Sequence, residues 1–475
     1  MRKNACGILT GAAYSGLVPE FPYSRLRRRP DVEAENLQAH DVTDILLVER
    51  ALALGLPGSE IAVIGDDYGA ITLALADAGR HGIRVHQDLA TGRRALALNA
   101  EELGLSGFVA GNADESASPR GVDAGRAATA PNDLGSPALF ASHDLGPELL
   151  TGARLVLLQL PKSLAELEEI ADAVARWAAP DVVLVAGGRV KHMTLGQNEV
   201  LGRRFAHVQA ERAERKSRLV VASEALPVPV EPPFPVTAAH DGLTLVAHGG
   251  AFAGPRLDIG TRALLEVLGL SGAQLSKNDG ARSEKRPNGA EHDSSGGVVH
   301  GGAALRQAQG PSAQGPKAQG PAGWVAEPVE ASRTVIDLGC GTGALAASWA
   351  LAHPQDRVVA TDRSAAAVAS ARATAFANGV ADRVIVMHDD AGSELADASA
   401  DVVLLNPPFH LGTSVHTGAA TRLFEAAARI LRPGAELFTV FNSSLGYRAE
   451  LARIIGPTEQ LHRTSKFTVT RSIRR

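Results

Sequence analysis

The feature that most constrains the fold of this 475-residue chain is a glycine-rich turn between two apolar segments. Residues 334–338 have the composition of a buried strand and residues 344–352 that of a helix, with Gly339, Gly341 and Gly343 between them. Glycine reaches positive φ without steric cost and lets the backbone approach a ligand closely. A helix that starts at such a turn presents free N–H groups. The turn therefore predicts an α/β fold with a ligand at the carboxyl edge of a parallel sheet.

Acidic residues at the same edge indicate that this ligand is a nucleoside. Asp362 ends the next predicted strand, about 20 residues past the turn, where a carboxylate takes both ribose hydroxyls. Asp337 lies before the first glycine and is expected to hold the ammonium of a methionine moiety. Asp389 and Asp390 follow a third predicted strand, and one of them is expected to accept from an adenine amino group. Because the spacing differs from the G-x-G-x-x-G turn of dinucleotide dehydrogenases, the expected cofactor is S-adenosylmethionine, with no metal.

A second motif, Asn406-Pro407-Pro408-Phe409, ends a fourth predicted strand and supplies hydrogen-bond acceptors. An exocyclic amine conjugated to a ring is a poor nucleophile. The Asn406 side-chain oxygen and the Pro407 carbonyl are expected to accept its N–H groups and to aim its lone pair at the methyl group. The two prolines stiffen the turn, and Phe409 offers a face on which a planar base stacks. The motif predicts direct in-line transfer of a methyl group to an sp² amine.

With these motifs the chain resembles the bacterial two-domain ribosomal RNA guanine-N2 methyltransferases, which modify the small or the large subunit. The residues that carry the resemblance are 26–34 with 41–44, 252–261, 337–343, 406–410 and 466–469. The resemblance implies S-adenosylmethionine-dependent methylation of a guanine N2 amine. It also implies ribosomal RNA, or a ribosomal subunit in assembly, as the partner.

Two alternatives stay open at this point. Adenine-N6 and glutamine-N5 methyltransferases share the Asn-Pro-Pro-Phe motif, although His410 directly after it favours guanine N2 within the resembled family. The alternative from another class is a catalytically silent RNA-binding or ribosome-assembly protein. The intact Asp337, Asp362 and Asn406 count against that second alternative.

The first half of the chain repeats this organisation in an altered form. Residues 59–76 have the strand-turn-helix layout of residues 334–352, and residues 154–163 match residues 401–409. The repeat has lost the residues that the chemistry needs, since its turn contains Asp66, Asp67 and Tyr68 and its second motif reads Gln159-Leu-Pro-Lys162. We therefore expect two tandem Rossmann-like class I methyltransferase folds, of which the first is degenerate.

The expected domains are residues 21–235, degenerate, and residues 236–475, catalytic, with a seven-stranded and mostly parallel sheet. The closing strand, within residues 466–471, is expected to be antiparallel to its neighbour. The first domain is expected to present RNA or to act as a structural partner. Its candidate RNA contacts are Lys162 and a basic helix around residues 212–218.

Composition limits the setting of the protein. Residues 272–331 are rich in Gly, Ser, Pro and Gln, repeat Ala-Gln-Gly-Pro three times, and predict a disordered insert. Residues 1–20 are expected to be a disordered start. Two cysteines are too few for a disulfide framework, and no apolar run has the roughly 18 residues of a membrane span. A cytoplasmic location without a membrane partner is expected, and the sequence carries no signal for the oligomeric state.

Overall fold

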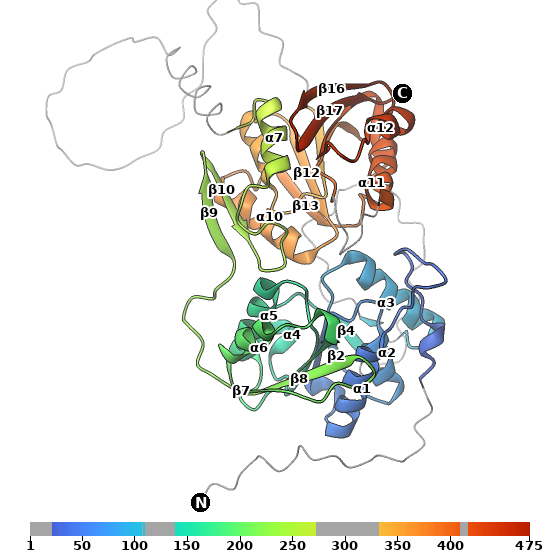
Figure 1. Cartoon of the computed structure of the whole chain (residues 1–475), viewed down its shortest axis with the longest axis vertical. Helices are drawn as coiled ribbons and strands as arrows, with labels where there is room; N and C mark the ends of the chain where they lie inside the picture. Colours follow the sequence, from blue (N-terminus) through green and yellow to red (C-terminus); the bar gives the residue numbers. More distant parts are fainter. Residues whose placement is uncertain (1–20, 107, 110–137, 272–331, 409–416) are drawn as a thin grey trace, which may run out of the picture.

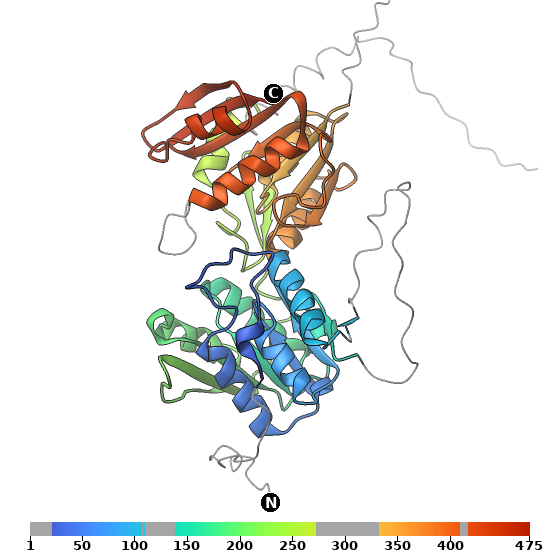
Figure 2. The same cartoon turned by 90° about the vertical axis from the view of Figure 1, so that its right-hand side faces the viewer.

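The computed structural model describes residues 21–106, 108–109, 138–271, 332–408 and 417–475. These residues form two α/β folds, one above the other in Figures 1 and 2. The predicted disordered segments, 1–20 and 272–331, lie outside the described residues, and so do Phe409 and His410. The predicted fold class is confirmed, since both folds are built on sheets with a parallel centre.

The first fold has an eight-stranded sheet. Its strands are β1 (Ile61–Ile64), β2 (Ile83–His86), β3 (Phe108–Val109), β4 (Phe140–Ser142), β5 (Leu155–Gln159), β6 (Val183–Arg189), β7 (Phe205–Ala210) and β8 (Ser217–Ala225). They lie in the order β3-β4-β2-β1-β5-β6-β8-β7, and only the contacts of β8 are antiparallel. Its helices are α1 (Val42–Leu54), α2 (Ala70–Asp77), α3 (Ala90–Leu103), α4 (Pro147–Leu150), α5 (Leu164–Trp177) and α6 (Leu195–Gly202).

The basic helix predicted around residues 212–218 is wrong. This segment is the connection between the antiparallel strands β7 and β8. Arg215 and Lys216 turn the chain there with φ of 48° and 68°, values that a helix does not contain. The basic residues of this segment led to the prediction of a helix, whereas the chain forms a hairpin whose second strand, β8, is mostly buried.

The second fold has the predicted seven-stranded, mostly parallel sheet. Its strands are β11 (Thr334–Leu338), β12 (Arg357–Asp362), β13 (Val384–His388), β14 (Ala400–Leu405), β15 (Leu431–Asn442), β16 (Thr458–Arg463) and β17 (Phe467–Ile473), in the order β13-β12-β11-β14-β15-β17-β16. Strand β17 is antiparallel to both of its neighbours, as predicted for the closing hairpin. The helices are α9 (Ala344–Ala352), α10 (Ala365–Ala377), α11 (Thr417–Ile430) and α12 (Arg448–Ile454).

A hairpin of β9 (Val236–His240) and β10 (Leu243–Ala247), followed by α7 (Ile259–Val267), precedes these elements and packs on the second sheet. Figure 1 shows β10 beside α10, and backbone N–H groups along the edge of the hairpin are bonded to side chains at this helix. Ser370, Thr374 and Asn378 accept from backbone N–H groups of His248, Val246 and Thr244 at 2.9–3.0 Å. Four residues of helix rise about as far as two residues of strand, so this spacing covers an edge that would otherwise be unpaired.

Helix α9, which follows the glycine turn, lies inside the second fold. Its residues from Ala344 to Ala350 are all buried, as expected of a helix that is apolar on every side. The small alanines let the turn before it lie close to β11 and β12. Within the described ranges, no helix is long and apolar enough to cross a membrane.

Candidate active site

The glycine turn after β11 has an open side and a packed side. Gly339 and Gly341 have φ of 79° and 54°, and a Cβ on either would meet no atom within 4 Å. Gly343 differs, because a Cβ there would lie 2.9 Å from the Cβ of Ala371 on α10. The first two glycines therefore leave room for a ligand, whereas the third lets two helices approach each other.

These two glycines border a cavity of about 360 Å³ at the carboxyl edge of the second sheet. The predicted site residues that line it are Gly339, Gly341, Asp362, Asp389, Asp390, Asn406, Pro407 and Pro408. They come from loops that follow four different strands. The sheet therefore brings together side chains that are up to 69 positions apart in the sequence.

Asp362 is oriented by the turn that it faces. The backbone N–H of Gly341 donates to its Oδ2 and the N–H of Ser364 donates to its Oδ1, both at 2.9 Å. Burial raises the pKa of this carboxyl. Its position agrees with the predicted contact to ribose hydroxyls, which stays a prediction.

Asp337 does not line the cavity. It is buried, and its Oδ2 accepts from the backbone N–H of Ala346 at 3.0 Å in the first turn of α9. Burial raises its pKa to about 7, and the nearby charge of Asp362 contributes. The geometry accounts for Asp337 as a support of the turn. The predicted contact with a methionine ammonium stays untested.

Asp389 and Asp390 are both buried at the wall of the cavity. Asp389 accepts from Ser393 Oγ at 2.6 Å, from the Glu394 N–H at 2.9 Å and from Arg94 at 3.0 Å. Asp390 forms an ion pair with Arg422. Three donors hold Asp389, so it fixes the wall in place, and the adenine contact predicted for one of the two acids stays a prediction.

Asn406 has one side of its amide held and the other side free. Its Nδ2 donates to Asp258 Oδ2 and to Thr261 Oγ1, both at 3.0 Å. A carboxylate accepts only, so these bonds fix which side of the amide carries the nitrogen. The Asn406 Oδ1 is buried and has no hydrogen-bond partner among the described residues. A buried acceptor without a partner is uncommon in native structures, and Asn406 borders the cavity, where a donor of a bound molecule can reach this oxygen.

Pro407 and Pro408 complete this part of the wall. Pro407 is buried, Pro408 is exposed, and both border the cavity next to Asn406. Phe409, which the sequence predicts as a stacking face, lies outside the described residues. The stacking role predicted for Phe409 therefore stays a prediction.

Asp258 and Thr261 are site residues to which the sequence analysis gave no role. Asp258 caps α7, because its Oδ2 accepts from the N–H groups of Gly260 (2.9 Å) and Thr261 (3.1 Å). The same oxygen accepts from Asn406. An Asp directly before an amphipathic helix is a recognisable N-cap, but its distance of 148 positions from Asn406 hid the second bond.

The first fold contributes to the wall of this site from outside. Arg94 of α3 donates to Asp389, to Ser393 (2.7 Å) and to Glu394 (2.8 Å). Asp88 accepts from Ser364 Oγ at 3.1 Å and from the N–H of Ala366 at 2.9 Å. Figure 2 shows that α3 begins at the boundary of the two folds.

The backbone also pairs across this boundary. Leu89 and Ser364 form an antiparallel bridge, flanked by the bonds from Ala90 N–H to Arg363 O and from Ala365 N–H to Asp88 O, both 2.8 Å. Leu89 lies three residues past His86, which pairs with Ile64, and Ser364 lies three residues past Thr361, which pairs with Leu338. The bridge therefore joins equivalent positions of the two folds.

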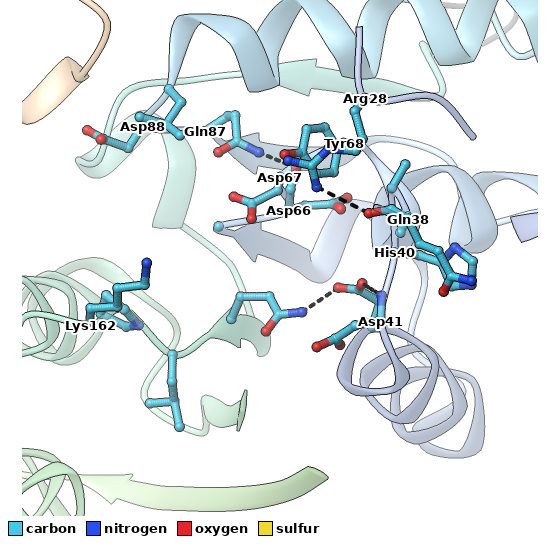
Figure 3. Close-up of a pocket in the computed structure, with 18 of the residues that line it drawn as sticks. Arg28, Gln38, His40, Asp41, Asp66, Asp67, Tyr68, Gln87, Asp88 and Lys162 are labelled. Carbon is cyan, nitrogen blue, oxygen red and sulfur yellow. Dashed lines mark hydrogen bonds between the residues drawn. The ribbon is translucent and has the colours of Figure 1, made fainter. Parts of the chain in front are cut away.

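The first fold has a larger cavity, about 560 Å³, at the matching edge of its sheet. Figure 3 shows Asp66, Asp67 and Tyr68 on one side of it and Lys162 on another. Several polar groups around it are bonded to each other, whereas Nδ1 of His40 has no hydrogen-bond partner among the described residues. Asp66 accepts from the N–H groups of Ile71 (3.2 Å) and Thr72 (2.7 Å), the Tyr68 hydroxyl donates to Asp31 (2.8 Å), Gln87 donates to the Asp66 carbonyl, and Gln159 donates to Asp44. The smaller cavity is the candidate active site, because it combines an open glycine turn with an amide oxygen that no donor of the described residues reaches.

No group of three His, Cys, Asp or Glu side chains that could hold a metal ion occurs in the described part of the chain. The single described cysteine, Cys340, is buried in the glycine turn, and burial raises the pKa of its thiol. A thiol held in its neutral form is a poor nucleophile. The groups that the site provides for binding and catalysis are therefore hydrogen-bond acceptors and the exposed backbone of the glycine turn.

The fold and the open glycine turn define a class I methyltransferase, present as one intact copy and one altered copy. Comparisons with known proteins agree. The family model for the methyltransferase small domain matches residues 325–471, and the RLMG N-terminal domain matches residues 19–123 and 124–226. A T. thermophilus 16S rRNA N2 methyltransferase, solved in complex with AdoMet and guanosine, has the same fold, with 21% identity, a TM-score of 0.60 and 92% of each chain covered.

Sequence relatives define the family more narrowly. A ribosomal RNA large subunit methyltransferase G of Pseudomonas fluorescens (strain Pf-5) is 30% identical and covers 96% of this chain and 99% of its own length. Its namesake from Streptomyces avermitilis is 29% identical and covers 95% of this chain and 97% of its own. The chain belongs to the ribosomal RNA large subunit methyltransferase G family.

Proposed function

We propose that this chain transfers the methyl group of S-adenosylmethionine to the exocyclic N2 amine of a guanine in large-subunit ribosomal RNA. The observation that carries the proposal is the Oδ1 of Asn406, which has no partner in the described part of the chain and borders a cavity next to an open glycine turn. The names of the relatives support ribosomal RNA of the large subunit as the substrate class.

The residues of the second fold fit the cofactor. Gly339 and Gly341 leave open space where side chains would stand, and Asp362 faces that space. We assign the ribose hydroxyls to Asp362 and the adenine side to the loop of Asp389 and Asp390. When bound, S-adenosylmethionine supplies an electrophilic methyl group on a sulfonium.

Asn406 acts on the nucleophile. Its Oδ1 and the Pro407 carbonyl accept the two N–H groups of the amine, so the nitrogen lone pair points toward the methyl carbon. Bound S-adenosylmethionine would supply the methyl carbon to which the amine nitrogen bonds, its sulfur would keep the electron pair of the broken C–S bond, and the methylated nitrogen would release its extra proton to water. Positioning supplies most of the rate in such a displacement, and Asp258 and Thr261 position Asn406.

The test uses the full chain, S-adenosylmethionine with an isotope-labelled methyl group, and large-subunit RNA from a strain in which this gene is deleted. We propose that the enzyme is cytoplasmic and that its substrate is either free RNA or RNA within an assembling subunit. The RNA is therefore offered in both forms. Mass analysis of nucleosides should show the label in N2-methylguanosine. Label in N6-methyladenosine, in glutamine of a ribosomal protein, or in nothing at all would overturn the proposal.

A further inference from the structure

An exposed aromatic ring stands at the mouth of the candidate active site. Phe252 is 74% exposed and yet borders the same cavity as Asn406. It lies in the loop that joins β10 to α7. A phenyl ring left open to water beside a ligand cavity is a typical platform for a nucleic-acid base, because every base has a face that can stack.

The loop that carries Phe252 is tied down on both sides of the ring. The N–H of Ala251 donates to His248 O and the N–H of Gly254 donates to Ala251 O, both at 3.1 Å. A ring nitrogen of His240 bonds to Pro255 O at 2.7 Å. The loop ends at Asp258, which holds Asn406. The loop that presents the ring therefore also supplies the side chain that holds the catalytic amide.

Arg256 of the same loop is a cation without a carboxylate. It is exposed and borders the cavity, and no acidic side chain of the described residues lies within ion-pair distance of it. Arg422 differs, since it is paired with Asp390 at the wall of the cavity. A free guanidinium beside a nucleic-acid site is suited to phosphate, which accepts two of its N–H groups.

We propose that Phe252 stacks on the target guanine and that Arg256 pairs with an adjacent phosphate of the RNA. This proposal rests on the proposed function and adds the residues that present the base to Asn406. The stack holds the plane of the base, while Asn406 reads its amine edge. Arg256 acts on RNA affinity, without a share in the methyl transfer itself.

The first test is Phe252→Ala, measured as single-turnover methylation at saturating large-subunit RNA and saturating cofactor. The expected loss is roughly 5- to 100-fold, the range of ring-on-base stacking, with an unchanged dissociation constant for S-adenosylmethionine by calorimetry. Phe376→Ala is the matched control, because Phe376 is 81% exposed on α10 and does not border the cavity. Phe252→Trp should restore the rate, because it keeps a stacking face.

The second test is Arg256→Ala, measured as RNA affinity against salt concentration. The expected result is weaker binding and a salt slope reduced by about one phosphate contact, with the saturated rate preserved. Arg357→Ala is the control, since Arg357 is exposed and begins β12 at the opposite edge of the sheet.

The outcomes separate this inference from the proposed function. If wild-type protein does not methylate guanine, the proposed function is wrong. If wild-type protein is active and Phe252→Ala equals Phe376→Ala, the stacking role is wrong. If Phe252→Ala weakens RNA binding and keeps the saturated rate, the ring contacts a neighbouring base and the assignment to the target guanine is overturned. If RNA affinity depends on salt concentration with the same slope in Arg256→Ala and Arg357→Ala, the phosphate contact assigned to Arg256 is wrong.

Discussion

The two folds of this chain have the same strand register at their sheet edges and differ in what their polar groups are bonded to. In the second fold the Asn406 oxygen has no partner among the residues that the structure describes, and two glycines face open space. In the first fold, the side chains of Asp66, Gln87 and Gln159 all take part in internal hydrogen bonds. Leaving a buried acceptor unpaired costs about 1–3 kcal/mol. The comparison teaches that the active copy keeps a locally destabilising group that the altered copy has replaced.

The strand register shows which residue of the first fold replaces each site residue of the second fold. The pairs of equivalent positions in the first and second folds are Val63 and Asp337, Asp67 and Gly341, Gln87 and Asp362, and Gln159 and Asn406. Asp88 lies one position after Gln87 and is therefore equivalent to Arg363. It caps the turn of the second fold instead of facing a ligand of its own.

The largest effect is expected for Asn406→Ala. The rate of methyl transfer should fall by about two to three orders of magnitude, because the acceptor aimed at the reacting amine is gone. The dissociation constant of S-adenosylmethionine, from calorimetry, should stay the same. Gln159→Ala at the equivalent position is the control and should keep the rate. Equal losses in both variants would mean that the first fold is not catalytically silent.

Asp362→Ala is expected to weaken cofactor binding by about 10- to 100-fold, because the carboxylate assigned to the ribose and its bond to Gly341 are both removed. The measurement is calorimetric titration with S-adenosylmethionine. Gln87→Ala tests the equivalent position of the first fold and should leave the single binding event unchanged. A second binding event lost in Gln87→Ala would contradict the contrast drawn between the two cavities.

Asp337 should make the stability of the second fold depend on pH. Its pKa is raised from 3.8 to about 7 by burial, so the folded protein keeps a proton that the unfolded chain loses. The free energy of unfolding should therefore decrease as pH rises from about 4 to 7, by at most about 1.4 kcal/mol per pH unit from this group, and then level off.

Asp337→Asn isolates this contribution, since the amide can still accept from Ala346 but does not titrate. The measurement is the difference in denaturant unfolding between the wild type and the variant without cofactor at pH 5, 6, 7 and 8. The wild type should lose stability relative to the variant up to about pH 7. A constant difference across these pH values would show that Asp337 is already ionised in the folded protein.

The smallest effect is expected for Arg94→Ala. Its three bonds to the loop of Asp389 hold the cofactor wall from the first fold, so their loss should weaken S-adenosylmethionine binding by a few-fold, since a partly exposed ion pair contributes about 1 kcal/mol. Arg94→Lys should recover part of the lost S-adenosylmethionine affinity. Arg50→Ala, which breaks a pair with Glu211 inside the first fold, should change nothing. If Arg94→Ala binds the cofactor like the wild type, the first fold does not support that wall.

The sequence was sufficient for the elements that depend on local pattern. The glycine turn, the strand before it and the closing hairpin near residues 458–473 follow from composition and spacing, and the duplication follows from repeating the pattern. The segment around residues 212–218 shows the limit of this approach, since charge alone does not distinguish a helix from a hairpin connection.

The contacts that orient the site could not be predicted in this way. Asp258 and Asn406 are 148 positions apart, and Arg94 and Asp389 are 295 apart. No local pattern links residues at such separations. The bond from the Ala346 N–H to Asp337 could not be read from the sequence either, since the pattern shows only an acid beside a glycine turn. The ligand contact that the sequence predicts for Asp337 stays a prediction.

The bridge between Leu89 and Ser364 has a further consequence. A contact in which each half offers the same positions to the other is isologous, the arrangement of a two-fold symmetric dimer. In terms of quaternary structure, this chain is a pseudo-dimer on one backbone. The symmetry breaks at α3, where Arg94 reaches the other half and the equivalent residue of α10 is Ala369, which has no donor to extend. At this position the first fold therefore holds the loop of Asp389 in the second fold, and the second fold makes no equivalent contact with the first.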